Sequence, residues 1–222
     1  MNKEKIIIFL CLLITIFSIS KAYANIETNT LEGKTIYLDP GHGGIDSGTT
    51  YKKILEKDIN LVICQKLKTA LTNEGATVYL TREKDTDLSV KNKHRKRSDL
   101  ISRAYLINKT KPDLYISIHQ NYIANTKWKG TQIFYTTRNK NNKDIAEKLT
   151  KYLKEKSYSV RPPKQNNTYY MYRNIDPPGV LIEVGFLSNP DDRYRLTHEK
   201  YQDIIVDNLL YSIKKYFATQ NT

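Results

Sequence analysis

The chain has 222 residues, of which 39% are hydrophobic, and a formal net charge of +13 at pH 7. This length allows one sizeable core and leaves little for a second, so we expect one folded domain. The positive excess favours anionic partners such as wall polymers or phospholipid headgroups, but no motif of interleaved aromatic and basic residues accompanies it, and we expect no nucleic-acid partner.

The first 24 residues have the features of an export signal. Two lysines precede an apolar run over residues 6–19, and Ala-Tyr-Ala at 22–24 fits a small-x-small cleavage site. The run is short for a membrane span, and a retained anchor is the alternative. We therefore expect residues 1–24 to be a signal peptide and 25–222 to form the exported domain, which would contact the membrane only through an uncleaved leader.

The first half of this domain alternates between strand and helix patterns. A predicted strand over residues 35–38 ends at Asp-Pro and a run of glycines. From 56 to 74, apolar residues recur at three- and four-residue steps, which is helical spacing, and Gly75 ends the helix. Cys64 lies on the apolar side of that helix, which favours a buried structural cysteine. A second strand follows over 77–81.

The second half continues the alternation. Residues 82–98 are polar and basic without an apolar period, and they indicate a mobile loop or a helix entrance. The patterns beyond them predict helices over 98–108, 143–156 and 199–217, and strands over 113–118, 130–136 and 180–184. Residues 161–167 are typical of a loop, and 169–172 fit no single pattern.

Alternating strands and helices are typical of an α/β fold. We expect a single domain with a mainly parallel, twisted sheet that is flanked by helices on both faces. In such sheets, residues that follow separate strands meet in one crevice at the carboxyl ends of the strands.

Two histidines and two glutamates stand where such a crevice would gather them. His42 follows the first strand, His119 ends a later one, Glu183 lies in the last, and Glu56 opens the first helix. Two imidazoles and one carboxylate suit zinc, and a fourth carboxylate left unbound could deprotonate water. Taken singly, each histidine also fits a hydrogen-bonded core residue, and the strand glutamate also fits a salt bridge.

Glu183 is unusual because its strand is otherwise apolar. An unpaired charge there would be costly, so a basic side chain or a metal-bound water should lie nearby. Apolar surroundings would also raise the pKa of this carboxyl toward the range of a general base. The glycines at 41, 43 and 44 would permit close backbone approach around His42.

Several short motifs run along the domain. They are Asp-Pro-Gly-His-Gly-Gly at 39–44 with Asp46 and Gly48, Glu-Lys-Asp at 56–58, Thr-Arg at 81–82, Arg103 with Asn108, Ser-Ile-His-Gln-Asn at 117–121, and Glu183 with Gly-Phe-Leu-Ser-Asn at 185–189. This order, from about residue 34 to 217, resembles the zinc-dependent N-acetylmuramoyl-L-alanine amidases of the Amidase_3 type. Within that family the likeness is greatest to the germination-specific amidases of spore formers.

The resemblance implies Zn²⁺ held by His42, Glu56 and His119, with Glu183 as the catalytic base. It implies hydrolysis of the amide bond between N-acetylmuramic acid and L-alanine in peptidoglycan. For the germination-specific amidases the substrate is spore cortex, and the cut is a step toward muramic-δ-lactam. The site of action would be the cell wall or the forespore intermembrane space.

Three further residues are candidate substrate contacts. Asn121 adjoins a ligand, with a turn residue as the alternative. Trp128 could stack on a sugar face, with ordinary loop packing as the alternative. Arg103 could pair with a buried acid such as Glu183 or with a substrate carboxylate. The helix over 143–156 has a core-like apolar face, so we expect an open cleft with no helix over the metal.

Two other functions fit part of this pattern. An exported module that binds peptidoglycan without cutting it would leave Glu183 unexplained. A zinc carboxypeptidase or a polysaccharide deacetylase would use similar ligands, but should lack this order of motifs. The ligand set has no obvious neighbouring carboxylate and would bind zinc weakly, so an activating protein partner is a further hypothesis.

Overall fold

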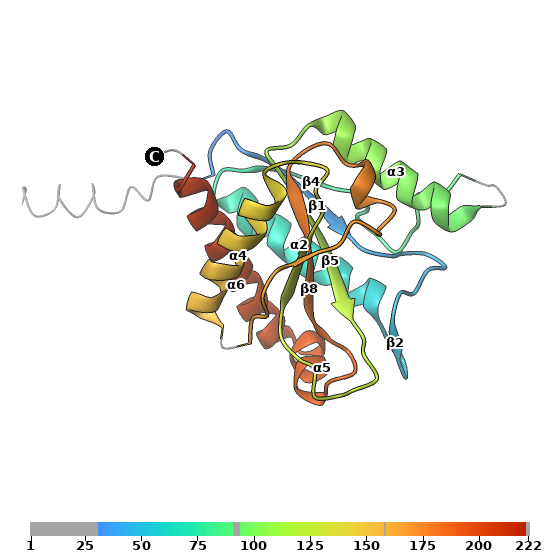
Figure 1. The fold of residues 1–222 in the computed structure, drawn as a ribbon. Helices are drawn as coiled ribbons and strands as arrows, with labels where there is room; N and C mark the ends of the chain where they lie inside the picture. Colours follow the sequence, from blue (N-terminus) through green and yellow to red (C-terminus); the bar gives the residue numbers. More distant parts are fainter. Residues whose placement is uncertain (1–30, 91–93, 158, 221–222) are drawn as a thin grey trace, which may run out of the picture. The chain divides into compact units, whose positions relative to one another are not determined.

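The computed structural model describes residues 31–90, 94–157 and 159–220, and the expected signal peptide lies outside them. The centre is a six-stranded sheet in the order β4-β1-β5-β8-β6-β7 (Figure 1). Its strands are β1 (Thr35–Pro40), β4 (Thr77–Leu80), β5 (Leu114–Asn121), β6 (Gln132–Tyr135), β7 (Lys164–Gln165) and β8 (Gly179–Phe186). A separate antiparallel hairpin pairs β2 (Thr50–Tyr51) with β3 (Ile54–Leu55).

The helices agree with the predicted periodicity and differ from it mainly at their ends. They are α2 (Glu56–Asn73), α3 (Arg95–Thr110), α4 (Asn142–Lys156), α5 (Pro190–Thr197) and α6 (Glu199–Ala218), with a 3-10 turn η1 (Tyr172–Asn174). The first turn of α3 therefore lies within residues 82–98, for which the sequence left a mobile loop and a helix entrance as alternatives. In the part of the chain that the structure describes, no helix has the length and hydropathy needed to cross a membrane.

The sheet is parallel over four strands and reverses at its far edge. β1 pairs in parallel with β4 and β5, and β5 pairs in parallel with β8. β6 runs antiparallel to β8. For two successive strands to run parallel, the chain between them must cross over through a dozen or more residues, usually a helix. The segment between β5 and β6 is a short loop without a helix, so β6 runs in the opposite direction. The expected mainly parallel sheet is therefore confirmed, with one reversal.

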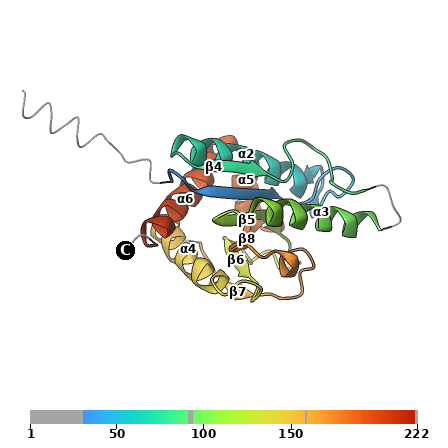
Figure 2. The same cartoon turned by 90° about the horizontal axis from the view of Figure 1, so that it is seen from above.

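Helices cover both faces of the sheet, as predicted. Figure 2 shows β1 between α2 and α3. Successive strand residues point to opposite faces. Ile36 and Leu38 accordingly belong to the large core formed with α2, α4 and α6. Tyr37, between them, belongs to a smaller core with Ala104 and Ile107 of α3.

The helix α5 was missed by the sequence patterns. The helix α5 is short, but Asn189 caps it by accepting a hydrogen bond from the Asp192 backbone N–H at 3.0 Å, and Pro190 is its first residue. This Asn-Pro signal was present in the sequence.

Cys64 is fully buried on α2, as expected.

Candidate active site

Three potential metal ligands converge at the carboxyl edge of the parallel strands. His42 lies in the loop after β1, Glu56 is the first residue of α2, and His119 lies in β5. One ligand atom from each of the three lies within 4.8 Å of the other two. Glu56 Oε1 is 3.2 Å from His42 Nε2 and 3.0 Å from His119 Nδ1. The structure thus brings together the three residues that the sequence singled out.

Glycines make this close approach possible, but only in part those that were expected. A Cβ on Gly41 would lie 2.2 Å from the His119 ring, and a Cβ on Gly48 would lie 2.6 Å from Glu56 Oε2. Gly43 and Gly44 instead approach the loop at 85–87. His42 itself has φ of 63°, a left-handed conformation that is uncommon outside glycine and often found at functional sites.

The expectation that no carboxylate supports the ligands is wrong for His42. Asp46 Oδ2 lies 3.0 Å from His42 Nδ1, so His42 presents its other nitrogen, Nε2, to Glu56. The hydrogen bond to His42 lowers the pKa of Asp46 well below its usual range. Asp46 belongs to the Asp-Pro-Gly-His-Gly-Gly motif segment, but its role follows only from the turn that brings it back onto the ring. The argument for weak metal binding therefore loses its basis.

Glu56 is buried and held by backbone donors. Its Oε2 accepts from the Thr49 N–H at 2.7 Å, and its Oε1 accepts from the Gln120 N–H at 3.0 Å. Burial alone would raise the pKa of Glu56, but the contacts of its carboxylate with the His119 and His42 rings lower it well below its usual range. Glu56 is therefore a carboxylate with a fixed orientation.

Glu183 is the fourth member of the group and has the environment of a base. In the sheet it lies directly beside His119 on β5 and beside Gln132 on β6. Only 8% of Glu183 is exposed, and its Oε2 has no hydrogen-bond partner among the described residues. Burial, and then the nearby Glu56 carboxylate, raise the pKa of Glu183 to about 8. The charge of the His42 ring acts in the opposite direction but does not outweigh these effects, and within the described ranges Glu183 forms no ion pair. Its unpaired oxygen is therefore positioned to accept a proton.

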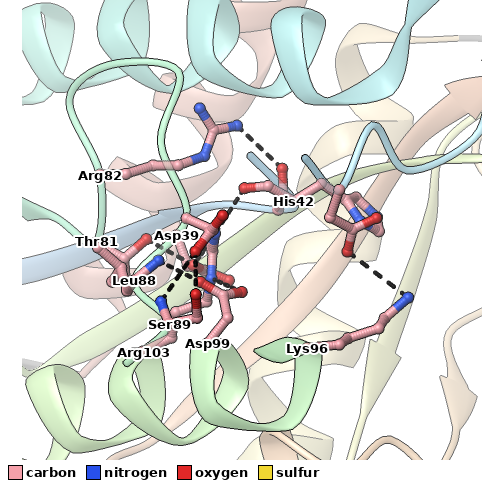
Figure 3. Close-up of polar contacts among 12 residues, drawn as sticks. Asp39, His42, Thr81, Arg82, Leu88, Ser89, Lys96, Asp99 and Arg103 are labelled. Carbon is pink, nitrogen blue, oxygen red and sulfur yellow. Dashed lines mark hydrogen bonds and ion pairs between the residues drawn. The ribbon is translucent and has the colours of Figure 1, made fainter. Parts of the chain in front are cut away.

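Arg103 pairs with buried acids, which was one of the two expectations, but these acids do not include Glu183. Only 1% of Arg103 is exposed, and it forms ion pairs with Asp39 and Asp99, each at 2.8 Å, rather than with Glu183 (Figure 3). Its Nη2 also donates to the His42 carbonyl at 2.6 Å. Burial would raise the pKa of Asp39, but the Arg103 guanidinium and the hydrogen bonds from Ser117 and Thr81 together lower it. Arg103 thus holds the His42 loop, and this geometry does not favour a contact with substrate.

The other two candidate contacts have different positions. Asn121 lies at the end of β5 and lines the cleft beside the metal ligands. Trp128 is 39% exposed on the loop after β5, with the Arg161 guanidinium 4.0 Å above its ring, and it is not part of the cleft lining. Of these two residues, the structure therefore brings only Asn121 to the ligands.

The cleft has a volume of about 550 Å³ and is lined with tyrosines that the sequence reading missed. They are Tyr122, Tyr169, Tyr170 and Tyr172. Three of these come from the segment whose pattern was ambiguous. Within the described ranges no residue of α4 lines the cleft, because the apolar face of α4 packs against α6 and the sheet. This agrees with the prediction that α4 does not cover the ligands.

Taken together, these features define a class of protein. An α/β domain that gathers two imidazoles and two buried carboxylates at the carboxyl edge of its sheet has the parts of a metal-assisted hydrolase. Three potential ligands surround one position, and an unpaired carboxylate lies beside them.

Comparison with known proteins identifies the family. The family model for N-acetylmuramoyl-L-alanine amidase matches residues 36–215. The chain is 42% identical over 193 residues to the germination-specific N-acetylmuramoyl-L-alanine amidase of Bacillus subtilis (strain 168), covering 85% of this chain and 81% of that protein. The chain therefore belongs to the N-acetylmuramoyl-L-alanine amidase family, and its activity is hydrolysis of the bond between N-acetylmuramic acid and L-alanine.

Solved structures agree with this assignment. The CwlD amidase from Clostridioides difficile, solved in complex with the GerS lipoprotein, has a TM-score of 0.79 at 34% identity, covering 84% of this chain and 100% of that one. The catalytic domain of CwlV from Bacillus (Paenibacillus) polymyxa var. colistinus has a TM-score of 0.72 at 27% identity, covering 83% and 98%. Both the expected fold and the expected enzyme class are confirmed.

Proposed function

We propose that this amidase is a zinc enzyme of the spore cortex, in which it removes stem peptides from muramic acid on the way to muramic-δ-lactam. The observation that carries the catalytic part is the unpaired, buried Glu183 carboxyl beside three converging ligands. The cortex assignment is supported by the identity to the germination-specific relative.

The donor set fits the proposed ion. His42, Glu56 and His119 supply two nitrogens and one carboxylate oxygen, which is a common zinc set with a position left for substrate or water. A zinc ion bound there would supply a Lewis acid that polarises a carbonyl and makes water more acidic.

In this proposal Glu183 moves the proton. Its unpaired Oε2 accepts a proton from the attacking water as the new C–O bond forms at the lactyl carbonyl. The same carboxyl then donates that proton to the L-alanine nitrogen as the C–N bond breaks. The products are a muramic acid residue with a free lactyl carboxylate and a stem peptide with a free amino terminus.

Substrate contacts, location and partner complete the proposal. Asn121 is favoured as a contact by its place in the cleft lining, whereas Trp128 would reach only a more distant part of the glycan. We propose action outside the membrane, in the cell wall or the forespore intermembrane space, after export by residues 1–24. An activating protein partner is also part of the proposal, and the solved complex of the CwlD amidase with the GerS lipoprotein supports binding of a partner protein.

Replacement of the base tests the proposal. The Glu183→Gln variant should retain zinc but release peptide about 10²-fold to 10⁴-fold more slowly, because it cannot accept the proton. Cortex-type peptidoglycan is digested with each protein, and the fragments are identified by mass. Glu147→Gln, on the exposed side of α4, is the control and should release peptide at the parent rate.

Two results would contradict this assignment. Peptide release by Glu183→Gln at the parent rate would remove Glu183 from the reaction. Full peptide release by parent protein that has been stripped of zinc, and shown by elemental analysis to contain none, would remove the metal.

A further inference from the structure

Tyr172 makes a contact with a proposed ligand that nothing in the sequence pattern indicated. Its Oη lies 3.0 Å from His119 Nε2 and 2.9 Å from Ser117 Oγ. Tyr172 is 7% exposed, in the η1 turn, and Ser117 and His119 are two residues apart on β5, so their side chains point to the same face. One phenol therefore bridges both side chains.

The direction of these hydrogen bonds follows from the number of protons available. Asp39 is a buried carboxylate paired with Arg103, and it can only accept. Ser117 Oγ lies 2.5 Å from Asp39 Oδ2 and gives its single proton to it. Ser117 can then only accept from Tyr172, and the one phenol proton is used in that bond. Tyr172 Oη is left to accept from His119, which requires a proton on Nε2.

The other nitrogen of His119 faces the ligand group. Nδ1 lies 3.0 Å from Glu56 Oε1, on the side where His42 also approaches. We propose that Tyr172 is a positioning residue that holds His119 with its proton on Nε2 and its Nδ1 lone pair turned toward the metal position. This inference rests on the proposed zinc site and adds the tautomer of one of its ligands.

The two histidines are then held in opposite ways. His42 is oriented through Nδ1 by the Asp46 carboxylate, whereas His119 is oriented through Nε2 by a neutral phenol. Groups that hydrogen-bond the free nitrogen of a metal-bound histidine fix its tautomer and strengthen ligation. The chain Asp39, Ser117, Tyr172 and His119 connects this effect to the buried Arg103.

Removal of one oxygen atom tests the inference. Tyr172→Phe should keep the ring packing against Tyr169 but bind zinc about 10-fold to 100-fold more weakly, measured by competition with a chromogenic chelator. Tyr169→Phe removes a hydroxyl from the same cleft without touching His119, and it is the matched control, with zinc affinity close to that of the parent. Thermal unfolding of the metal-free proteins checks that both variants fold.

A spectroscopic measurement separates positioning from general structure. In zinc-loaded protein with ¹⁵N-labelled histidine, the parent should show the His119 proton on Nε2, and in Tyr172→Phe this proton should exchange faster with solvent. A proton found on Nδ1, or a Tyr172→Phe variant with parent zinc affinity, would overturn the inference while leaving the proposed function intact. A folded parent protein that binds no zinc would overturn both.

Discussion

Glu183 combines a destabilising location with a useful one. A carboxyl in the middle of a buried strand with one oxygen unpaired gives up hydration without replacing it. The same desolvation produces a base whose pKa lies close to neutral pH. At the residue scale, this enzyme therefore lowers its stability at the position where we place the proton transfer.

Because the pKa of Glu183 is raised in the folded state, the unfolding free energy of the metal-free protein should depend on pH. Between the ordinary pKa of 4.5 and the folded-state value of about 8, folded Glu183 keeps a proton that the unfolded chain has lost. Ionisation of the buried carboxyl is what destabilises the fold, so the stability linked to the protonated form is fully present below pH 4.5 and is lost as the pH rises to about 8. The stability of Glu183→Gln relative to the parent should thus increase by about 1 kcal/mol per pH unit over this range.

Urea unfolding of both metal-free proteins at pH 5, 6.5 and 8 measures this difference. The comparison with the parent isolates Glu183 from the other ionisable groups, which both proteins share. A difference in unfolding free energy that is independent of pH would show that Glu183 is already ionised in the folded state.

At the scale of elements, Arg103 ties α3 to the end of β1. From α3 it reaches Asp39, the Pro40 carbonyl at 2.8 Å and the His42 carbonyl, so one side chain holds the loop that carries a ligand. Figure 3 shows this convergence together with Asp99 on the same helix. The position of His42 is thus set by a helix on the opposite side of the sheet from α2.

Removal of this tie should be costly. Arg103→Leu leaves Asp39 and Asp99 buried without their partner, and we expect a loss of about 3 to 5 kcal/mol in unfolding free energy. Lys148→Ala, which breaks an exposed ion pair with Asp144 on α4, is the control and should cost less than about 0.5 kcal/mol. Equal losses in urea unfolding would mean that the buried network has no special role.

At the scale of the whole domain, the proposed ligands come from three segments that only the folded chain brings together. A loop, a helix start and a strand contribute one ligand each. An ion that binds this arrangement and not the unfolded chain must stabilise the fold.

Zinc should therefore raise the thermal stability of the domain. At a free concentration 100-fold above its dissociation constant, it should add about 2.7 kcal/mol to the unfolding free energy. His42→Ala should lose most of this gain, whereas His198→Ala, which removes an exposed histidine near α5, should keep it. Calorimetry with and without zinc measures the shift, and an equal shift in both variants would place the ion elsewhere.

Local patterns in the sequence already determined much of this protein. The three- and four-residue apolar steps of α2 and the apolar run around Glu183 each encode an element and its buried side, because those periods are properties of the backbone itself. Since parallel strands share a carboxyl edge, the convergence of His42, Glu56, His119 and Glu183 followed from these elements and the family motifs.

Only the tertiary structure decided which side chains support that group. The partners of Arg103, the bond from Asp46 to His42, and the bridge from Tyr172 to Ser117 and His119 depend on turns and on strand register. Tyr172 is 53 residues from His119 along the chain, and no local period relates the two. Periodicity specifies which face a residue occupies, whereas contacts between distant residues are set by how whole elements pack.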